Sequence, residues 1–241
     1  MAELAYAPVL AVKNDGAPSS PRHSVLVRIT HWMTTVGFLA LLVSGMAILL
    51  AQPGLYWGET GIFGDPSLIN LHLPQNEHHS GWGRSLHFLA AWVCVLTGVW
   101  YALSGLLTHH FRNNLLPARA DLAWRAIWRV LSNHWRLKRP DEEEARRYNV
   151  VQRLSYLAVV FVLFPLMIQT GLAMSPAVTS VLPAMVGIWS GHQSARTVHF
   201  FVMVLLLLFL IVHVAMVCLA GFRTRTVAMI TGRSAAALEH R

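Results

Sequence analysis

Four long apolar segments constrain what this 241-residue chain can fold into. They cover residues 27–51, 85–108, 154–174 and 197–221. A helix of about 20 apolar residues crosses the hydrocarbon core of a bilayer. Charged residues make up 12% of the chain, against about 25% in soluble domains, so a small soluble core would not accommodate this much apolar surface. We therefore predict an all-α membrane protein built as a four-helix transmembrane bundle, with a kink at Pro165 in the third helix.

The positive charges of the chain predict its orientation in the membrane. Of the 19 Lys and Arg residues, 17 lie in segments that would share one side of the bundle, namely 1–30, 109–153 and 221–241. The positive-inside rule places that side, and with it both termini, in the cytoplasm. The net charge of +8 is thus explained by topology and requires no nucleic-acid partner. We expect a multi-pass protein of the bacterial inner membrane.

The same division predicts the organisation of the chain. A cytoplasmic N-terminal segment covers residues 1–24, the membrane domain covers 25–222, and a cytoplasmic tail covers 223–241. Residues Ala235 to His240 resemble a vector-derived tail and enter no functional argument. Within the cytoplasmic link 109–153, the interleaved Trp and Arg residues after Asp121 favour a helix at the lipid headgroups, with a soluble helix on a partner protein as the alternative.

Four of the 13 histidines fall within the predicted spans, at His31, His87, His199 and His213. Ionisable residues inside a membrane are costly, so each is a functional candidate. The alternating helix directions place His87 with His199 near the periplasm, and His31 with His213 near the cytoplasm. The last helix carries two of them 14 residues apart, which is close to four turns and about 21 Å along one face.

The paired histidines favour haem over other metal sites. Each pair offers two imidazoles with no carboxylate or thiolate from the spans, whereas zinc normally takes three or four protein ligands. A porphyrin supplies four donors and leaves two axial positions, which suit two histidines. We predict two haem b groups, one near each face, and an electron-transfer role. Buried structural histidines or proton relays are the alternative.

Three arginines precede these histidines by three residues each. Arg28 comes before His31, and Arg84 and Arg196 hold the same offset from the two predicted periplasmic ligands. Haem propionates are anionic and pair well with guanidinium groups, so we predict that these arginines bind propionates. Ordinary anchoring at the membrane interface is the alternative.

The segment Arg28-Ile29-Thr30-His31-Trp32 resembles the first-helix signature of a known family. That family is the bacterial cytochrome b561 and di-haem cytochrome b subunits, which serve nickel–iron hydrogenase, formate dehydrogenase and thiosulfate reductase. The resemblance covers roughly residues 22–222, including one histidine on the second helix and two on the fourth. It implies two b haems, a quinone or quinol, and a partner redox subunit.

A second match suggests where quinone binds. Tyr148-Asn149-Val150-Val151-Gln152 is similar to a Tyr-Asn-x-x-Gln segment of the formate dehydrogenase subunit, which lines a quinone pocket beside the cytoplasmic haem. By this resemblance Asn149 and Gln152 contact quinone near His213. A helix cap is the alternative role for Asn149.

The loops leave the redox partner open. Residues 52–83 contain His72, His78 and His79, and this loop either docks a periplasmic redox protein or covers the outer haem. The long link 109–153 departs from the hydrogenase and formate dehydrogenase subunits, which puts a partner identical to theirs in doubt.

The leading hypothesis is a di-haem carrier that passes electrons between a periplasmic redox partner and the membrane quinone pool, as the electron-transfer subunit of a respiratory oxidoreductase. A stand-alone superoxide oxidase coupled to quinone is the first alternative. It needs a positive outer funnel, and the outer side carries only Arg84 and Arg196. A non-redox scaffold or transporter is the second alternative.

Overall fold

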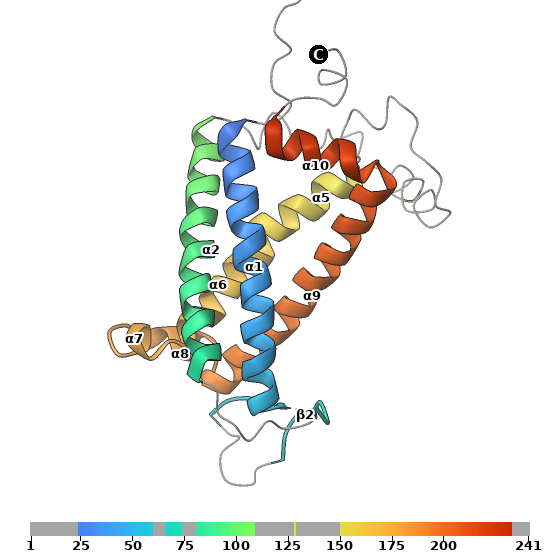
Figure 1. The fold of residues 1–241 in the computed structure, drawn as a ribbon. Helices are drawn as coiled ribbons and strands as arrows, with labels where there is room; N and C mark the ends of the chain where they lie inside the picture. Colours follow the sequence, from blue (N-terminus) through green and yellow to red (C-terminus); the bar gives the residue numbers. More distant parts are fainter. Residues whose placement is uncertain (1–23, 60–65, 74–80, 109–127, 129–149, 233–241) are drawn as a thin grey trace, which may run out of the picture.

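The structure is a computed structural model that describes residues 24–59, 66–73, 81–108, 128 and 150–232. In this part of the chain, four helical spans are long and apolar enough to cross a membrane, at Val25–Ala51, Gly81–Leu107, Val151–Ala173 and His192–Leu219. They run as long rods between two ends of the molecule (Figure 1). The prediction of an all-α membrane protein with four spanning helices is therefore confirmed.

The described elements follow one another along the chain with two very short strands among the helices. They are α1 (Val25–Ala51), β1 (Gly54–Leu55), β2 (Ile69–Asn70), α2 (Gly81–Leu107), α5 (Val150–Ala158), the π-helical turn η3 (Val159–Leu163), α6 (Phe164–Ala173), α7 (Pro176–Thr179), α8 (Ala184–Ile188), α9 (His192–Leu219) and α10 (Phe222–Thr231). The four spanning helices begin slightly before the apolar segments, because their first turns contain polar residues.

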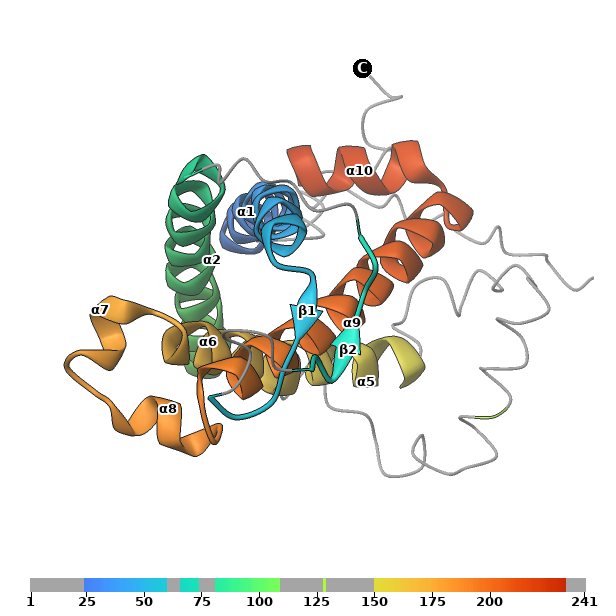
Figure 2. The same ribbon diagram turned by 90° about the horizontal axis from the view of Figure 1, so that it is seen from below.

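Small residues allow α1 and α2 to pack closely along their length (Figure 2). The buried residues of α1 repeat every seventh position, at Thr30, Gly37 and Ser44. A Cβ added to Gly37 would lie 2.6 Å from the sulfur of Cys94 on α2. Close approach at small residues is the usual way in which membrane helices associate, since lipid provides little hydrophobic drive.

The third span contains a distortion next to Pro165. Residues Val159–Leu163 form a π-helical turn, and α6 continues the helix from Phe164. Proline lacks the backbone N–H that would continue the helical ladder, and π-turns are a common way to absorb such a break. This span packs against α9, where Val159, Val202 and Leu206 form a buried apolar cluster.

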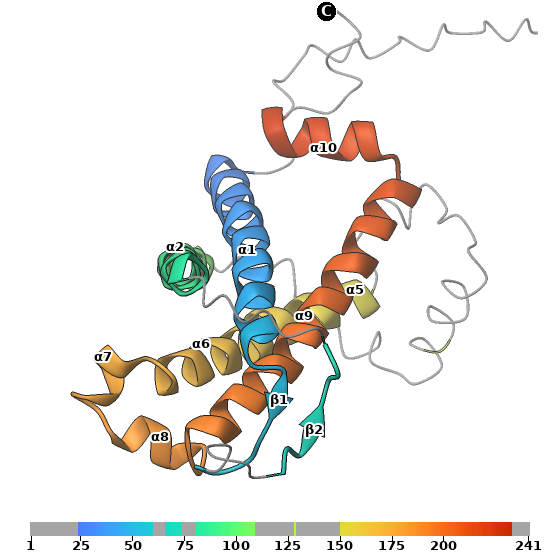
Figure 3. The ribbon, with the colours of Figure 1, turned by 60° about the horizontal axis from the view of Figure 1, so that its bottom comes forward.

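The bundle has two different ends, which we name the loop end and the α10 end. The loop end holds α7, α8 and the antiparallel β1–β2 pair, in which Gly54 faces Asn70 and Leu55 faces Ile69. Strand β1 lies beside α9, and β2 lies alongside β1 (Figure 3). At the other end, α10 lies across the bundle from the end of α9 toward the start of α1 (Figure 1).

Two side chains of α1 hold α10 in this position. The indole nitrogen of Trp32 donates to the Met229 carbonyl at 3.3 Å, and Arg28 donates to the Ile230 carbonyl at 2.9 Å. The expected helix in the link 109–153 lies outside the described residues except for Trp128, which is helical and exposed.

Candidate functional site

The structure brings the four span histidines together in two pairs. At the loop end, the ring centroids of His87 on α2 and His199 on α9 are 6.3 Å apart. At the α10 end, the centroids of His31 on α1 and His213 on α9 are 6.4 Å apart. Helix α9 thus contributes one histidine to each pair, and the partner comes from a helix of the α1–α2 pair.

These separations fit two imidazoles on opposite sides of one metal ion. A histidine nitrogen lies about 2 Å from a bound transition metal and about 1.1 Å from its own ring centre, which gives a centroid separation of about 6.2–6.4 Å. Among the described residues, no group of three or more His, Cys, Asp or Glu side chains could hold a metal ion alone. The donor set therefore fits a metal whose other ligands come from a porphyrin.

Two hydroxyl groups support the pair at the loop end. The Ser44 hydroxyl on α1 lies 3.0 Å from Nδ1 of His87, and the Thr170 hydroxyl on α6 lies 2.8 Å from Nδ1 of His199. Sequence reasoning missed both residues, because a serine or threonine in a membrane helix normally bonds only its own backbone. With Nδ1 occupied, each ring has Nε2 left for a metal.

The pair at the α10 end has an aromatic surrounding. The ring of Phe209 stacks on His213 with centroids 5.8 Å apart and an interplanar angle of 21°. Tyr156 of α5 meets the same imidazole edge-on at 6.3 Å. Gln152, a predicted quinone contact, lies one helical turn before Tyr156 and is half-buried, whereas Asn149 lies outside the described residues.

The three arginines predicted to bind propionates lie in three different environments. Arg84 is exposed on α2, and no contact of its side chain with another described residue is observed. Arg28 donates from Nη1 to the Ile230 carbonyl, and its Nε is buried with no partner among the described residues. The Arg196 guanidinium donates to the carbonyls of Gly54, at 2.8 Å, and Gln52. Propionate binding by these arginines stays a prediction.

The 52–59 segment is fastened to the first turns of α9 at the loop end. The Gly58 N–H donates to the Ser194 hydroxyl at 2.6 Å, and the Gly58 carbonyl accepts from the Gln193 N–H at 3.1 Å. The Glu59 carboxylate accepts from the His192 N–H at 3.0 Å, where the helix N-terminus favours an anion. These contacts hold Gly58 and Glu59 against the first turn of α9.

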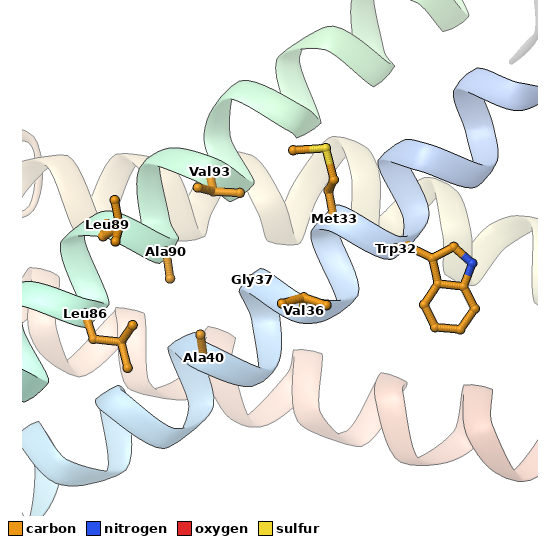
Figure 4. Close-up of a pocket in the computed structure, with 9 residues that line it drawn as sticks. All are labelled: Trp32, Met33, Val36, Gly37, Ala40, Leu86, Leu89, Ala90 and Val93. Carbon is orange, nitrogen blue, oxygen red and sulfur yellow. The ribbon is translucent and has the colours of Figure 1, made fainter. Parts of the chain in front are cut away.

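Two cavities are lined by residues other than the four paired histidines. An apolar groove of about 500 Å³ runs between α1 and α2, and its nine lining residues include none of the four paired histidines (Figure 4). A polar cavity of about 410 Å³ lies at the loop end beside Tyr56, Asn70 and His72. His72 has a positive φ of 48°, and its Nδ1 lies 2.9 Å from the Asn70 carbonyl oxygen. His78 and His79 lie outside the described residues.

Residues 22–232 match the family described as prokaryotic cytochrome b561. The chain belongs to that family. Members of the cytochrome b561 family are multi-pass membrane proteins that bind b-type haem and transfer electrons, and the paired histidines described above fit that cofactor. The match covers all four spans and α10.

The chain is also similar to a curated relative. The chain is 29% identical over 213 residues to a putative protein-methionine-sulfoxide reductase subunit of Azospira oryzae, which covers 87% of this chain and 96% of the relative. No solved structure matches the chain. The cytochrome b561 family is one of membrane-embedded redox subunits that typically partner with catalytic subunits.

Proposed function

We propose that the protein carries electrons through the membrane between a periplasmic redox partner and the quinone pool, using two haem b groups. The observation that carries this proposal is the presence of two histidine pairs at opposite ends of the bundle, with centroids 6.3 and 6.4 Å apart. One site at each end suits a protein whose substrates lie on opposite sides of the membrane.

The four histidines hold the two cofactors in this proposal. His87 and His199 bind the haem at the loop end, and His31 and His213 bind the haem at the α10 end. A haem with two axial imidazoles supplies a one-electron redox centre with no open coordination position. All four histidines are half-buried within the bundle. Arg84 remains able to turn its guanidinium toward a propionate.

The quinone site in this proposal lies at the α10 end. Gln152 and Tyr156 are four residues apart on α5 and thus face the same side of that helix. Tyr156 contacts the His213 ring, so the amide of Gln152 lies on the side of α5 that faces this histidine. Together with Asn149, the amide supplies hydrogen-bond partners for quinone oxygens at a helix end near water. The positive-inside rule assigns this end, with both termini, to the cytoplasm.

The partner in this proposal docks at the loop end. The described part of that end includes the 52–59 segment, the β1–β2 pair and the polar cavity beside His72. The relative from Azospira oryzae is described as a subunit of a putative protein-methionine-sulfoxide reductase. A catalytic reductase subunit on the periplasmic side is therefore the partner class that we propose, with electrons drawn from quinol.

The proposal is tested by counting haem and measuring reduction by a short-chain quinol in the purified protein. Two haems per chain are expected, and His87→Ala or His213→Ala is expected to leave one. Gln152→Leu is expected to slow reduction by quinol at least tenfold with both haems retained. Gln169→Leu, an exposed amide farther along the same span, is the matched control and should leave the rate unchanged.

Three results would count against the proposal. A haem content other than two per chain would remove the two-site assignment. Equal quinol rates in Gln152→Leu and Gln169→Leu would remove the quinone site from α5. Rapid reduction by superoxide, with quinone as acceptor and no partner present, would instead favour the stand-alone superoxide oxidase.

A further inference from the structure

Two segments of the chain with a similar local pattern face the histidines of the loop-end pair. Residues 43–47 read Val-Ser-Gly-Met-Ala on α1, and residues 169–173 read Gln-Thr-Gly-Leu-Ala on α6. In each, a hydroxyl residue is followed directly by glycine. We name Ser44–Gly45 and Thr170–Gly171 the hydroxyl–glycine pairs. The first faces His87 and the second faces His199, and both rings are contacted in the same way.

Each hydroxyl has its single hydrogen engaged on its own helix. Ser44 donates to the Ala40 carbonyl at 2.7 Å, and Thr170 donates to the Leu166 carbonyl at 2.7 Å. A hydroxyl has one hydrogen to donate and two lone pairs to accept. With that hydrogen on the helix carbonyl, each oxygen accepts from the imidazole, at 3.0 Å for the Ser44 oxygen and 2.8 Å for the Thr170 oxygen.

It follows that Nδ1 carries the hydrogen in both rings. The carbonyls of Leu41 and Met167, each three residues before its hydroxyl, also interact with the two imidazoles, and a carbonyl can only accept. The neutral imidazole then has its lone pair on Nε2, which is the nitrogen that a metal binds. Both rings are thus fixed in the tautomer that a haem iron between them requires.

The glycines set the distance between each ring and the neighbouring helix. A Cβ added to Gly45 would lie 3.5 Å from Cε1 of His87, and one added to Gly171 would lie 3.5 Å from Cε1 of His199. A methyl group is in ordinary contact at that distance, so alanine fits, but a larger side chain would push the ring away. The hydroxyl and the glycine together define where each imidazole lies.

We propose that Ser44 and Thr170 are positioning residues of the loop-end haem, which fix the tautomer of both axial imidazoles and lower the reduction potential of that haem. A ring whose N–H donates a hydrogen bond is a more basic ligand, and a more basic axial ligand stabilises the oxidised iron. Both axial ligands of the loop-end haem therefore have this hydrogen bond, and the two hydroxyls that accept it come from helices far apart in the sequence. This inference rests on the proposed haem sites, not on the quinone site.

The test is an equilibrium redox titration of the haem absorption bands in the purified protein, which requires no quinone and no partner. In Ser44→Ala and Thr170→Val, one of the two haem components should move to a more positive potential while the other stays unchanged. Mutation of a residue that hydrogen-bonds a metal ligand commonly changes metal affinity by about tenfold or more. A tenfold change in an equilibrium constant corresponds to about 59 mV for a one-electron couple. The double variant should shift further than either single variant.

Two variants on α2 serve as matched controls. Ser104 donates to its own helix at the Tyr101 carbonyl, and Thr97 is buried without a hydrogen bond to other described residues. Ser104→Ala and Thr97→Val should shift neither component. Unchanged potentials in both Ser44→Ala and Thr170→Val, or equal shifts in the controls, would overturn the proposal.

A variant that loses the loop-end haem is also informative. Thr170→Ser keeps the hydroxyl, so loss of that haem in Thr170→Val with retention in Thr170→Ser would support the positioning role. Loss in both would show that the shape of threonine matters and its hydrogen bond does not, which would overturn the proposal. A failure of quinol to reduce the protein would affect the quinone site only and leave this titration valid.

Discussion

Substitution of Gly191 by alanine is expected to release the 52–59 segment from α9. Gly191 has φ 128° and ψ 163°, a region of backbone conformation that is almost exclusive to glycine. A Cβ at this position would overlap the carbonyl of Gly58. The side chain would therefore force Gly58 away from the start of α9 and break the contacts that it makes there.

The structure gives a magnitude for this change. The backbone conformation costs an L-residue about 1–3 kcal/mol, and the two hydrogen bonds made by Gly58 contribute about 0.5–1.5 kcal/mol each. The local opening free energy should fall by about 2–6 kcal/mol, and each 1.4 kcal/mol is about tenfold in an equilibrium constant. Amide hydrogen exchange at Gly58 and Gln193, followed by mass spectrometry, should be at least about 30-fold faster in Gly191→Ala.

Gly187 provides the control for this experiment. It lies on α8 at the same end of the bundle, and a Cβ added there meets no atom within 4 Å. Gly187→Ala should leave exchange at Gly58 and Gln193 unchanged, and alanine should favour the helix by about 1 kcal/mol. Native-like protection of Gly58 and Gln193 in Gly191→Ala would refute the reasoning about this contact.

Three further outcomes are expected. Gly37→Ala should lower thermal stability in detergent by about 1–3 kcal/mol through crowding against Cys94, whereas Gly98→Ala, which has open space, should not; equal melting temperatures would contradict this. Arg28→Gln should remove the hydrogen bond to the Ile230 carbonyl, and amide hydrogen exchange should become faster in α10 only. Treatment with EDTA should leave the haem spectrum unchanged, since a porphyrin supplies four of the six iron ligands in the proposed sites; loss of haem bands would contradict this.

The spans and the depths of the histidines could be predicted because both depend on bilayer thickness and helix direction. Bilayer thickness fixes the length of an apolar helix, and alternating directions then assign a depth to every residue on it. His87 and His199 thus had to lie at one level, and His31 and His213 at another. The structure adds that the ring centroids within each pair lie 6.3 and 6.4 Å apart.

The contacts of single polar side chains could not be predicted in the same way. Thr35, Ser104 and Ser155 each bond their own helix backbone, as Ser44 and Thr170 do, so the sequence does not distinguish the two that also reach a histidine. That distinction depends on helix rotation and packing.

The arginines show the same limit. Their charge and depth follow from the sequence, but the partner of a long flexible side chain does not. Arg196 binds the carbonyls of Gly54 and Gln52, more than 140 positions earlier in the chain, and no local pattern predicts that contact.

Helix α9 has a consequence for how such a protein can be regulated. It carries one histidine of each pair, at His199 and His213, within a single uninterrupted helix. Their spacing is set by the helix rise of about 1.5 Å per residue and is held by backbone hydrogen bonds. A docked partner or a change in bilayer thickness can tilt α1 or α2, but it cannot lengthen α9. In the proposed function, the distance between the two haem ligands on α9 is therefore constant, so a partner would control electron transfer where electrons enter or leave the protein and not through this spacing.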